Sequence, residues 1–128
     1  MKLAENDTNI STETIIETTL RMLGLNKSYK GFNHLICAIT LVLENSDILT
    51  YICKGLYVEI AIQCGTTVAS VERNIRTAKE VIWRNCNENV LQSIFRDQYD
   101  AKIPNNAIFI DGLTDFIKLM INDELASR

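Results

Sequence analysis

The sequence predicts an all-α fold, a compact bundle of about six helices that contains a helix-turn-helix. Three observations support this prediction. Apolar residues recur at steps of three and four along most of the chain, which is the spacing of one buried helical face. No stretch alternates apolar and polar residues as a half-buried strand does. Short polar breaks separate the periodic segments, as at 26–28 and 85–87.

The domain organisation follows from length and composition. The 128 residues are enough for one domain with a real core and too few for two. Residues 1–10 are polar and lack periodicity, so we expect a flexible N-terminal arm there. Residues 11–128 then form a single folded domain, because the sequence has no internal repeat and no Pro-rich linker.

The first two helices are predicted from capping residues and from apolar residues at helical spacing. The first is predicted to begin after Ser11, a good N-cap, and to end at Gly24, a good C-cap. The second is predicted to begin near Phe32 and to end near 45–46. Its apolar residues are dense, so we expect it to lie deep in the core.

A third and a fourth helix follow. Ser46 or Asp47 is the expected N-cap of the third helix, which ends at Gly65. Its predicted packing stripe comprises Leu49, Ile52, Cys53, Leu56, Ile60 and Cys64. The fourth helix is predicted over 67–84, and its buried face comprises Val71, Ile75, Ala78 and Ile82 at steps of four, three and four.

Two further helices complete the bundle. A short fifth helix is predicted from Val90, Leu91, Ile94 and Phe95. The loop from Asp97 to Ile103 follows, and Pro104-Asn105 starts a last helix. Its expected packing side comprises Ile108, Phe109, Leu113, Phe116, Ile117, Met120 and Ile121. Gly112 inside this helix is interpreted as a close contact between helices.

The third and fourth helices together have the pattern of a helix-turn-helix. Counting from Tyr57, the small fifth position is Ala61, the glycine of the turn is Gly65 and the apolar fifteenth position is Val71. A small residue lets two helices approach, a glycine can take the left-handed conformation of the turn, and an apolar residue packs back between the helices. Asn74 does not fit the usual apolar eighteenth position, which Ile75 fills one step later.

The polar face of the fourth helix predicts contact with DNA. Glu72, Arg73 and Arg76 lie opposite the apolar face, and a rigid helix with arginines and a carboxylate near its N-terminal end is suited to reading base edges in a major groove. Arginine can donate two hydrogen bonds to guanine, while Glu72 can accept one from cytosine. The expected contacts to the DNA backbone are Thr66, Thr67, Ser70, Lys54 and Lys79, with solvent exposure as the alternative for the two lysines.

Charge gives a mixed indication. The net charge of −3 argues mildly against a nucleic-acid binder, since such domains are often basic. Residues 66–86, however, carry four cations against two carboxylates and sum to +2, which leaves −5 for the remainder. A positive stripe on an acidic body can bind DNA, with weak non-specific affinity.

Other classes of function find little support. No apolar run approaches the roughly 20 residues of a membrane helix, and 1–12 lacks the order of a signal peptide, so we expect a cytoplasmic protein without a membrane partner. The four cysteines are dispersed and are interpreted as reduced, buried small hydrophobes, and no metal site or cofactor is expected. His34 is interpreted as a surface residue or a helix-end hydrogen-bonder, and Trp83 as an aromatic residue between helices. No nucleophile elbow, phosphate-binding glycine loop or carboxylate pair is present, so an enzyme is not expected.

A Val-Glu-Arg-x-Ile-Arg core at 71–76, followed by Trp83, is a specific motif of the fourth predicted helix. Further distinctive pieces are Lys30-Gly31-Phe32, Leu56-Tyr57, Ile60-Ala61, Thr66-Thr67, Thr77-Ala78, 80–83, Ser93-Ile94-Phe95, Pro104-Asn105-Asn106 and Phe109-Ile110. With these residues the chain resembles, over nearly its whole length, the C-terminal effector-domain family of stage-zero sporulation protein A.

The resemblance implies a six-helix DNA-binding domain whose fourth helix enters the major groove and whose base-reading roles fall on Glu72, Arg73 and Arg76. Residues 11–128 are then a helix-turn-helix DNA-binding domain of a sporulation transcription regulator, acting on double-stranded DNA. A second copy on tandem sites, a related regulator and RNA polymerase are further candidate partners. Full-length family members carry a receiver domain, for which this chain has no room.

Two departures from the family pattern keep an alternative open. Ser70 stands where relatives tend to have an arginine, and Ile62-Gln63 replaces a basic pair. Both changes remove cations from the expected DNA face. The alternative is therefore a stand-alone interaction protein that modulates a full-length regulator without itself binding DNA.

Overall fold

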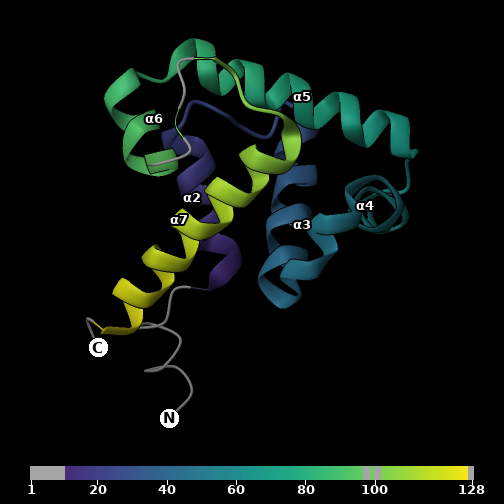
Figure 1. Ribbon diagram of the computed structural model, residues 1–128, viewed down its shortest axis with the longest axis horizontal. Coiled ribbons are helices and arrows are strands. Elements are labelled where there is room, and N and C mark those ends of the chain that lie inside the picture. The colour runs from purple at the N-terminus through teal and green to yellow at the C-terminus, as the bar shows by residue number, and fades with distance from the viewer. Residues whose placement is uncertain (1–10, 97–98, 100–101, 127–128) are drawn as a thin grey trace.

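The computed structural model describes residues 11–96, 99 and 102–126, and the predicted arm at 1–10 lies outside this range. Within the described residues the fold is all-helical and contains no strand (Figure 1). Its α-helices are α2 (Thr12–Met22), α3 (Lys30–Glu44), α4 (Tyr57–Cys64), α5 (Val68–Asn85), α6 (Glu88–Phe95) and α7 (Asn106–Ala126). The prediction of an all-α bundle of about six helices is confirmed for this part of the chain.

The core forms around α3, which contacts α2, α4, α5 and α7. The expectation that this helix lies deep in the protein is confirmed, because Phe32, Leu35 and Ile39 are fully buried. Figure 1 shows α5 along one edge of the bundle, with α4 at its N-terminal end and α6 beyond its C-terminal end. One face of α5 is therefore held by the bundle and the opposite face is left open.

An aromatic cluster closes the bundle at the far end of α5. The ring centroid of Trp83 lies 5.0 Å from that of Phe95 and 6.2 Å from that of Phe109. A Cβ added at Gly112 would collide with the ring of Phe95, so α6 and α7 can approach only because residue 112 has no side chain. The predicted roles of Trp83 as an interhelical aromatic and of Gly112 as a close contact are both confirmed.

Most helix ends agree with the predicted caps. The hydroxyl of Ser11 accepts a hydrogen bond from the N–H of Thr14 at 3.1 Å, and Gly24 has a φ of +94° just beyond α2. The side-chain oxygen of Asn105 accepts from the N–H of Ile108 at 2.9 Å at the start of α7. These contacts satisfy backbone groups that have no partner inside the helix.

The predicted third helix is wrong over its first half. Residues 46–64 form a 3₁₀ segment, η1 (Ser46–Tyr51), a π-helical segment, η2 (Ile52–Leu56), and only then α4. A 3₁₀ turn has three residues and not 3.6, so the expected apolar stripe does not stay on one face. Accordingly Leu49 and Ile52 are only partly buried, while Leu56 and Ile60 are fully buried.

The expected burial of the cysteines is also wrong in part. All four are free thiols, but Cys53 and Cys64 are exposed, and Cys37 and Cys86 are partly buried. Cys53 lies in the segment whose helical spacing is broken, and Cys64 is the last residue of α4. Burial raises the pKa of Cys37 to about 11, with Cys64 and two carboxylates adding to the effect, so its thiol stays protonated at neutral pH.

Among the described residues, no single helix is long and apolar enough to cross a membrane, and the stretch Ser46–Cys64 meets that test only together with α5, from which a 96° bend separates it.

Candidate nucleic-acid interface

The turn between α4 and α5 has the geometry predicted for a helix-turn-helix. Gly65 takes the left-handed conformation, with φ 66° and ψ 42°, which a glycine adopts without steric penalty. The N–H of Thr66 donates to the carbonyl of Ala61 at 2.9 Å, and the hydroxyl of Thr67 accepts from the N–H of Ser70 at 3.1 Å. The chain bends by 96° here, so α5 projects across the end of α4.

The buried face of α5 is the predicted one. Val71, Ile75, Ala78 and Ile82 are all fully buried. Ile75 fills the position at which Asn74 did not fit, because Asn74 is only partly buried at the edge of the packed face. Helix α5 is thus held along its length by apolar contacts, and its polar face is presented as one rigid unit.

The three predicted base-reading residues lie together on the open side of α5. Nη1 of Arg76 donates to both carboxylate oxygens of Glu72, at 2.6 and 2.8 Å, and about half of each side chain is exposed. Nη2 of Arg73 donates to the hydroxyl of Ser70 at 3.4 Å. Arg73 and Arg76 are both exposed.

These contacts orient the side chains but are weak enough to break when another partner binds. An exposed ion pair four residues apart on a helix stabilises by only about 0.3–0.5 kcal/mol. Breaking the pair between Arg76 and Glu72 therefore costs little compared with the roughly 1–3 kcal/mol of discrimination from a good contact to a base. In the free protein Arg76 donates to Glu72, and each of the two side chains could exchange this contact for a hydrogen bond to another group.

Four of the five predicted contacts to the DNA backbone have accessible positions. Thr67 and Lys54 are exposed, and Thr66 and Ser70 are partly exposed at the turn and in the first turn of α5. The four do not form one cluster, because Lys54 lies in η2, ahead of α4, and the other three follow it.

The prediction that Lys79 is available to a phosphate is wrong. The residue is 6% exposed, and its Nζ donates to Oδ1 of Asn106 at 2.8 Å. Burial lowers the pKa of Lys79; among the nearby charges, Glu80 and Glu72 raise this pKa and Arg76 lowers it. Lys79 lies one residue beyond the buried Ala78, so its stem enters the interface with α7 instead of pointing to solvent.

Asn106 is the residue of this region that sequence reasoning missed. Its Nδ2 donates to the hydroxyl of Tyr57 at 2.9 Å and, more weakly, to the carbonyl of Glu72 at 3.4 Å. With Lys79 on its oxygen, one amide links the start of α7 to α4 and α5. The only sequence signal was its place in the matched Pro-Asn-Asn stretch, which carries no chemical role by itself.

The other side of α5 faces the start of α3. A Cβ added at Gly31 would collide with the backbone carbonyl oxygen of Asn74 and lie 2.8 Å from the Cβ of Ala78, so the backbones of the two helices approach each other closely here. This approach brings Lys30 and His34 beside α5. His34 was expected at the surface or at a helix end, but it is in mid-helix and 5% exposed, so that interpretation is wrong.

A known protein family matches most of the sequence. The family model described as "Sporulation initiation factor Spo0A C terminal" matches residues 16–117, from α2 into α7. The matched stretch includes the helix-turn-helix, the open face of α5 and Asn106. The chain therefore belongs to the family of C-terminal DNA-binding effector domains of the sporulation initiation factor Spo0A.

Proposed function

We propose that the chain is a sequence-specific transcription regulator that reads the major groove with the N-terminal half of α5. The single observation that carries this proposal is the cluster of Glu72, Arg73 and Arg76 on the open face of a helix that the bundle fixes from behind. Arg73 and Arg76 donate to guanine O6 and N7, and Glu72 accepts from a cytosine amino group. Family membership supports DNA as the partner.

Contacts to the sugar-phosphate backbone set the register of this reading. In this proposal, Thr66, Thr67 and Ser70 at the start of α5 bind one strand, together with N–H groups that the first helical turn leaves free. Lys54 adds a cation from η2. Because few cations are available, we expect modest affinity for random DNA and a strong dependence on salt.

The experiment is a selection from random duplexes, followed by fluorescence anisotropy on the selected duplex and a scrambled one. The wild-type protein should prefer the selected duplex. Replacing Arg73 or Arg76 with alanine should reduce that preference by roughly 5- to 150-fold, the equivalent of one base contact. Arg84→Ala, on the same helix but in its last turn, is the matched control and should leave the preference unchanged. No enrichment in the selection, or equal preferences in all variants, would refute the proposal.

A specific observation favours a second candidate function. Ile62 is 69% exposed near the end of α4, next to the exposed Gln63. A large apolar side chain beside the turn is suited to a protein partner and adds nothing to phosphate binding. The chain would then modulate a full-length regulator without itself binding DNA.

The two candidates differ in what Ile62→Lys does. If the chain binds DNA through this face, an added cation strengthens binding to all duplexes by about threefold at physiological salt. If the chain binds a regulator, the same variant loses the complex in size-exclusion chromatography of the mixed proteins. Cooperative binding to a duplex with two sites would identify a second copy of the chain as a partner. Retention on purified RNA polymerase would identify the polymerase as one.

A further inference from the structure

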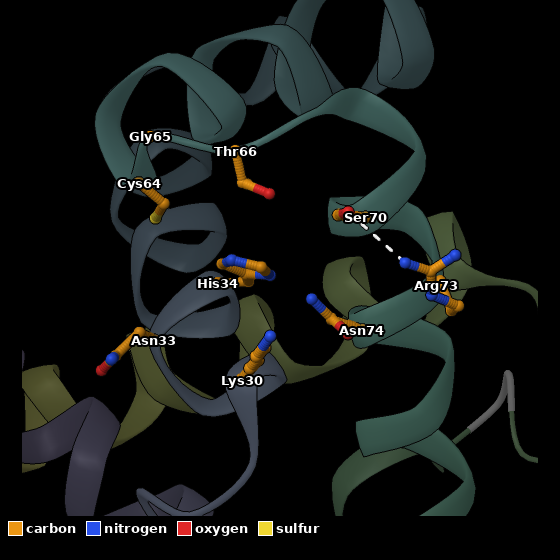
Figure 2. Close-up of a pocket in the computed structure, with 9 residues that line it drawn as sticks. All are labelled: Lys30, Asn33, His34, Cys64, Gly65, Thr66, Ser70, Arg73 and Asn74. Carbon is orange, nitrogen blue, oxygen red and sulfur yellow. Dashed lines mark hydrogen bonds between the residues drawn. The ribbon is translucent and has the colours of Figure 1, made fainter.

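A hollow lies between α3 and the start of α5, beside the turn of the helix-turn-helix (Figure 2). Its volume is about 470 Å³, and it is open to solvent on one side. In Figure 2 the side chains of Lys30, His34, Thr66 and Asn74 point toward this space, and Asn33 points away from it. Arg73 stands at the rim, where it is held by Ser70.

The lining of the hollow is cationic, although the chain as a whole is acidic. Lys30 and Arg73 carry positive charge, and no aspartate or glutamate is among the described residues that line the hollow. The whole chain has a net charge of −3. Two cations from different helices, with no carboxylate to neutralise them, create a local positive potential that attracts an anion.

His34 is a second, independent indication of a ligand. The residue is 5% exposed, and its Nδ1 has no hydrogen-bond partner among the described residues. A buried polar atom without a partner is unfavourable, and most such atoms in folded proteins are satisfied. Burial and then the charge of Lys30 lower the pKa of His34, so the ring is neutral at pH 7 and carries one N–H.

The hollow is a fixed feature of the packing. Gly31 lets α3 approach α5 closely enough that an added Cβ would collide with the carbonyl of Asn74. Lys30 and His34, on either side of Gly31 in sequence, therefore line the α3 side of the same hollow that Arg73 lines from α5.

We propose that this hollow binds a phosphoryl group through Lys30, Arg73 and the imidazole of His34, with the hydroxyls of Thr66 and Ser70 in support. The donors approach from two helices and a turn, which suits the tetrahedral arrangement of phosphate oxygens better than a planar carboxylate. The phosphoryl group has two candidate sources. One is the backbone of DNA flanking the groove, which rests on the proposed function, and the other is a free phosphorylated small molecule.

The test uses the fact that His34 is the only histidine of the chain. Inorganic phosphate is titrated into the full chain at constant ionic strength, with chloride as the reference, and the imidazole ¹H–¹⁵N signals are followed. The imidazole signals should move to saturation with phosphate, and the pKa of His34 should rise, because a bound anion stabilises the charged ring. Titratable or charged groups facing His34 are Lys30 on its own helix, Arg73 on α5 and Cys64 on α4.

Matched variants separate this site from general charge effects. Lys30→Gln should weaken phosphate binding about fivefold, the size of one ion pair across about 4 Å of water. Lys118→Gln removes an exposed lysine of α7 outside the hollow and should bind phosphate like the wild type. The proposal would be overturned if phosphate did not shift the imidazole signals of the wild type, or if the two variants lost phosphate affinity equally.

A second arm uses the selected duplex and separates the two sources. If the duplex shifts the signals of His34 and displaces phosphate, and Lys30→Gln lowers the slope of log affinity against log salt by roughly 0.9, the group is a DNA phosphate. If phosphate binds but the duplex leaves His34 unperturbed, the group belongs to a free ligand. Phosphate binding without any duplex binding supports the hollow and refutes the proposed function. Duplex binding in a protein whose His34 signals shift with neither phosphate nor the duplex supports the proposed function and refutes the hollow as a phosphoryl site.

Discussion

Replacing Gly31 with alanine tests the contact that sets α5 against α3. An alanine Cβ would meet the carbonyl oxygen of Asn74 at a distance that real Cβ atoms do not show, and would lie 2.8 Å from the Cβ of Ala78. The carbonyl belongs to the backbone of α5, so it cannot move as a flexible side chain does. The two helices must separate to admit the methyl group.

Two opposing effects determine the size of the change. Overpacking of this kind costs about 1–3 kcal/mol, and a clash with backbone places it near the upper end. Alanine in place of glycine in a helix contributes about 1 kcal/mol in the other direction. We therefore expect a net loss of about 2 kcal/mol in the free energy of unfolding, or roughly 8 °C in Tm for a chain of this size.

Urea denaturation followed by circular dichroism measures this change, with Gly55→Ala as the matched control. A Cβ at Gly55 would lie 3.4 Å from the nearest side-chain atom, of Ile48, which is ordinary contact, so the control should be neutral or slightly stabilised. Specific DNA affinity should fall in Gly31→Ala even where the protein remains folded, because α5, the helix proposed to read the bases, is displaced. A stability for Gly31→Ala equal to or above that of the wild type would refute the packing described for α3 and α5.

Four further predictions follow from the structure. Asn106→Ala leaves the Lys79 ammonium without its buried partner and should lower the free energy of unfolding by about 2 kcal/mol in urea titration; a loss below about 0.5 kcal/mol would contradict the network. Lys79→Met should leave the salt slope of DNA binding unchanged, whereas a slope reduced by about 0.9 would return Lys79 to the phosphate contacts. Thr67→Ala removes the N-cap of α5 and should cost about 1 kcal/mol in the same urea assay, while no loss would deny the cap. The pKa of His34 is lowered from its usual 6.5, so the unfolded chain takes up the proton first as the pH falls. The contribution of neutral His34 to stability is complete above pH 6.5 and is lost as the pH falls through the folded-state pKa. The wild type should therefore lose more stability between pH 7.5 and 5.5 than His34→Gln. Equal losses in the two proteins would contradict the lowered pKa of His34.

The sequence was sufficient to predict the helix-turn-helix because each of its requirements is local. Gly65 is predicted to take the left-handed conformation of the turn, and Ile75 is predicted to take the apolar position beside Asn74. Periodicity of apolar residues and the chemistry of caps are written in a few adjacent positions. The polar face with Glu72 followed from the same periodicity.

The features that sequence reasoning missed depend on contacts between distant segments. Nothing near Lys79 indicates that its ammonium meets Asn106, which lies 27 residues later in the chain. The burial of His34 follows from the close approach of α3 to α5. Gly31 permits this approach, but a glycine in the sequence does not by itself predict it. The break of the third helix at 46–56 was hidden because its apolar residues also fit helical spacing.

The most direct test of base reading by α5 is a double-mutant cycle between Arg73 and a guanine of the selected duplex. Each guanine is replaced in turn by 7-deazaguanine, which lacks the N7 acceptor, and anisotropy is measured with the wild-type protein and with Arg73→Ala. If Arg73 donates to that guanine, one position should weaken binding of the wild type by roughly 1–3 kcal/mol and leave the variant unaffected. Additive losses at every guanine would contradict the claim that this helix reads bases through Arg73.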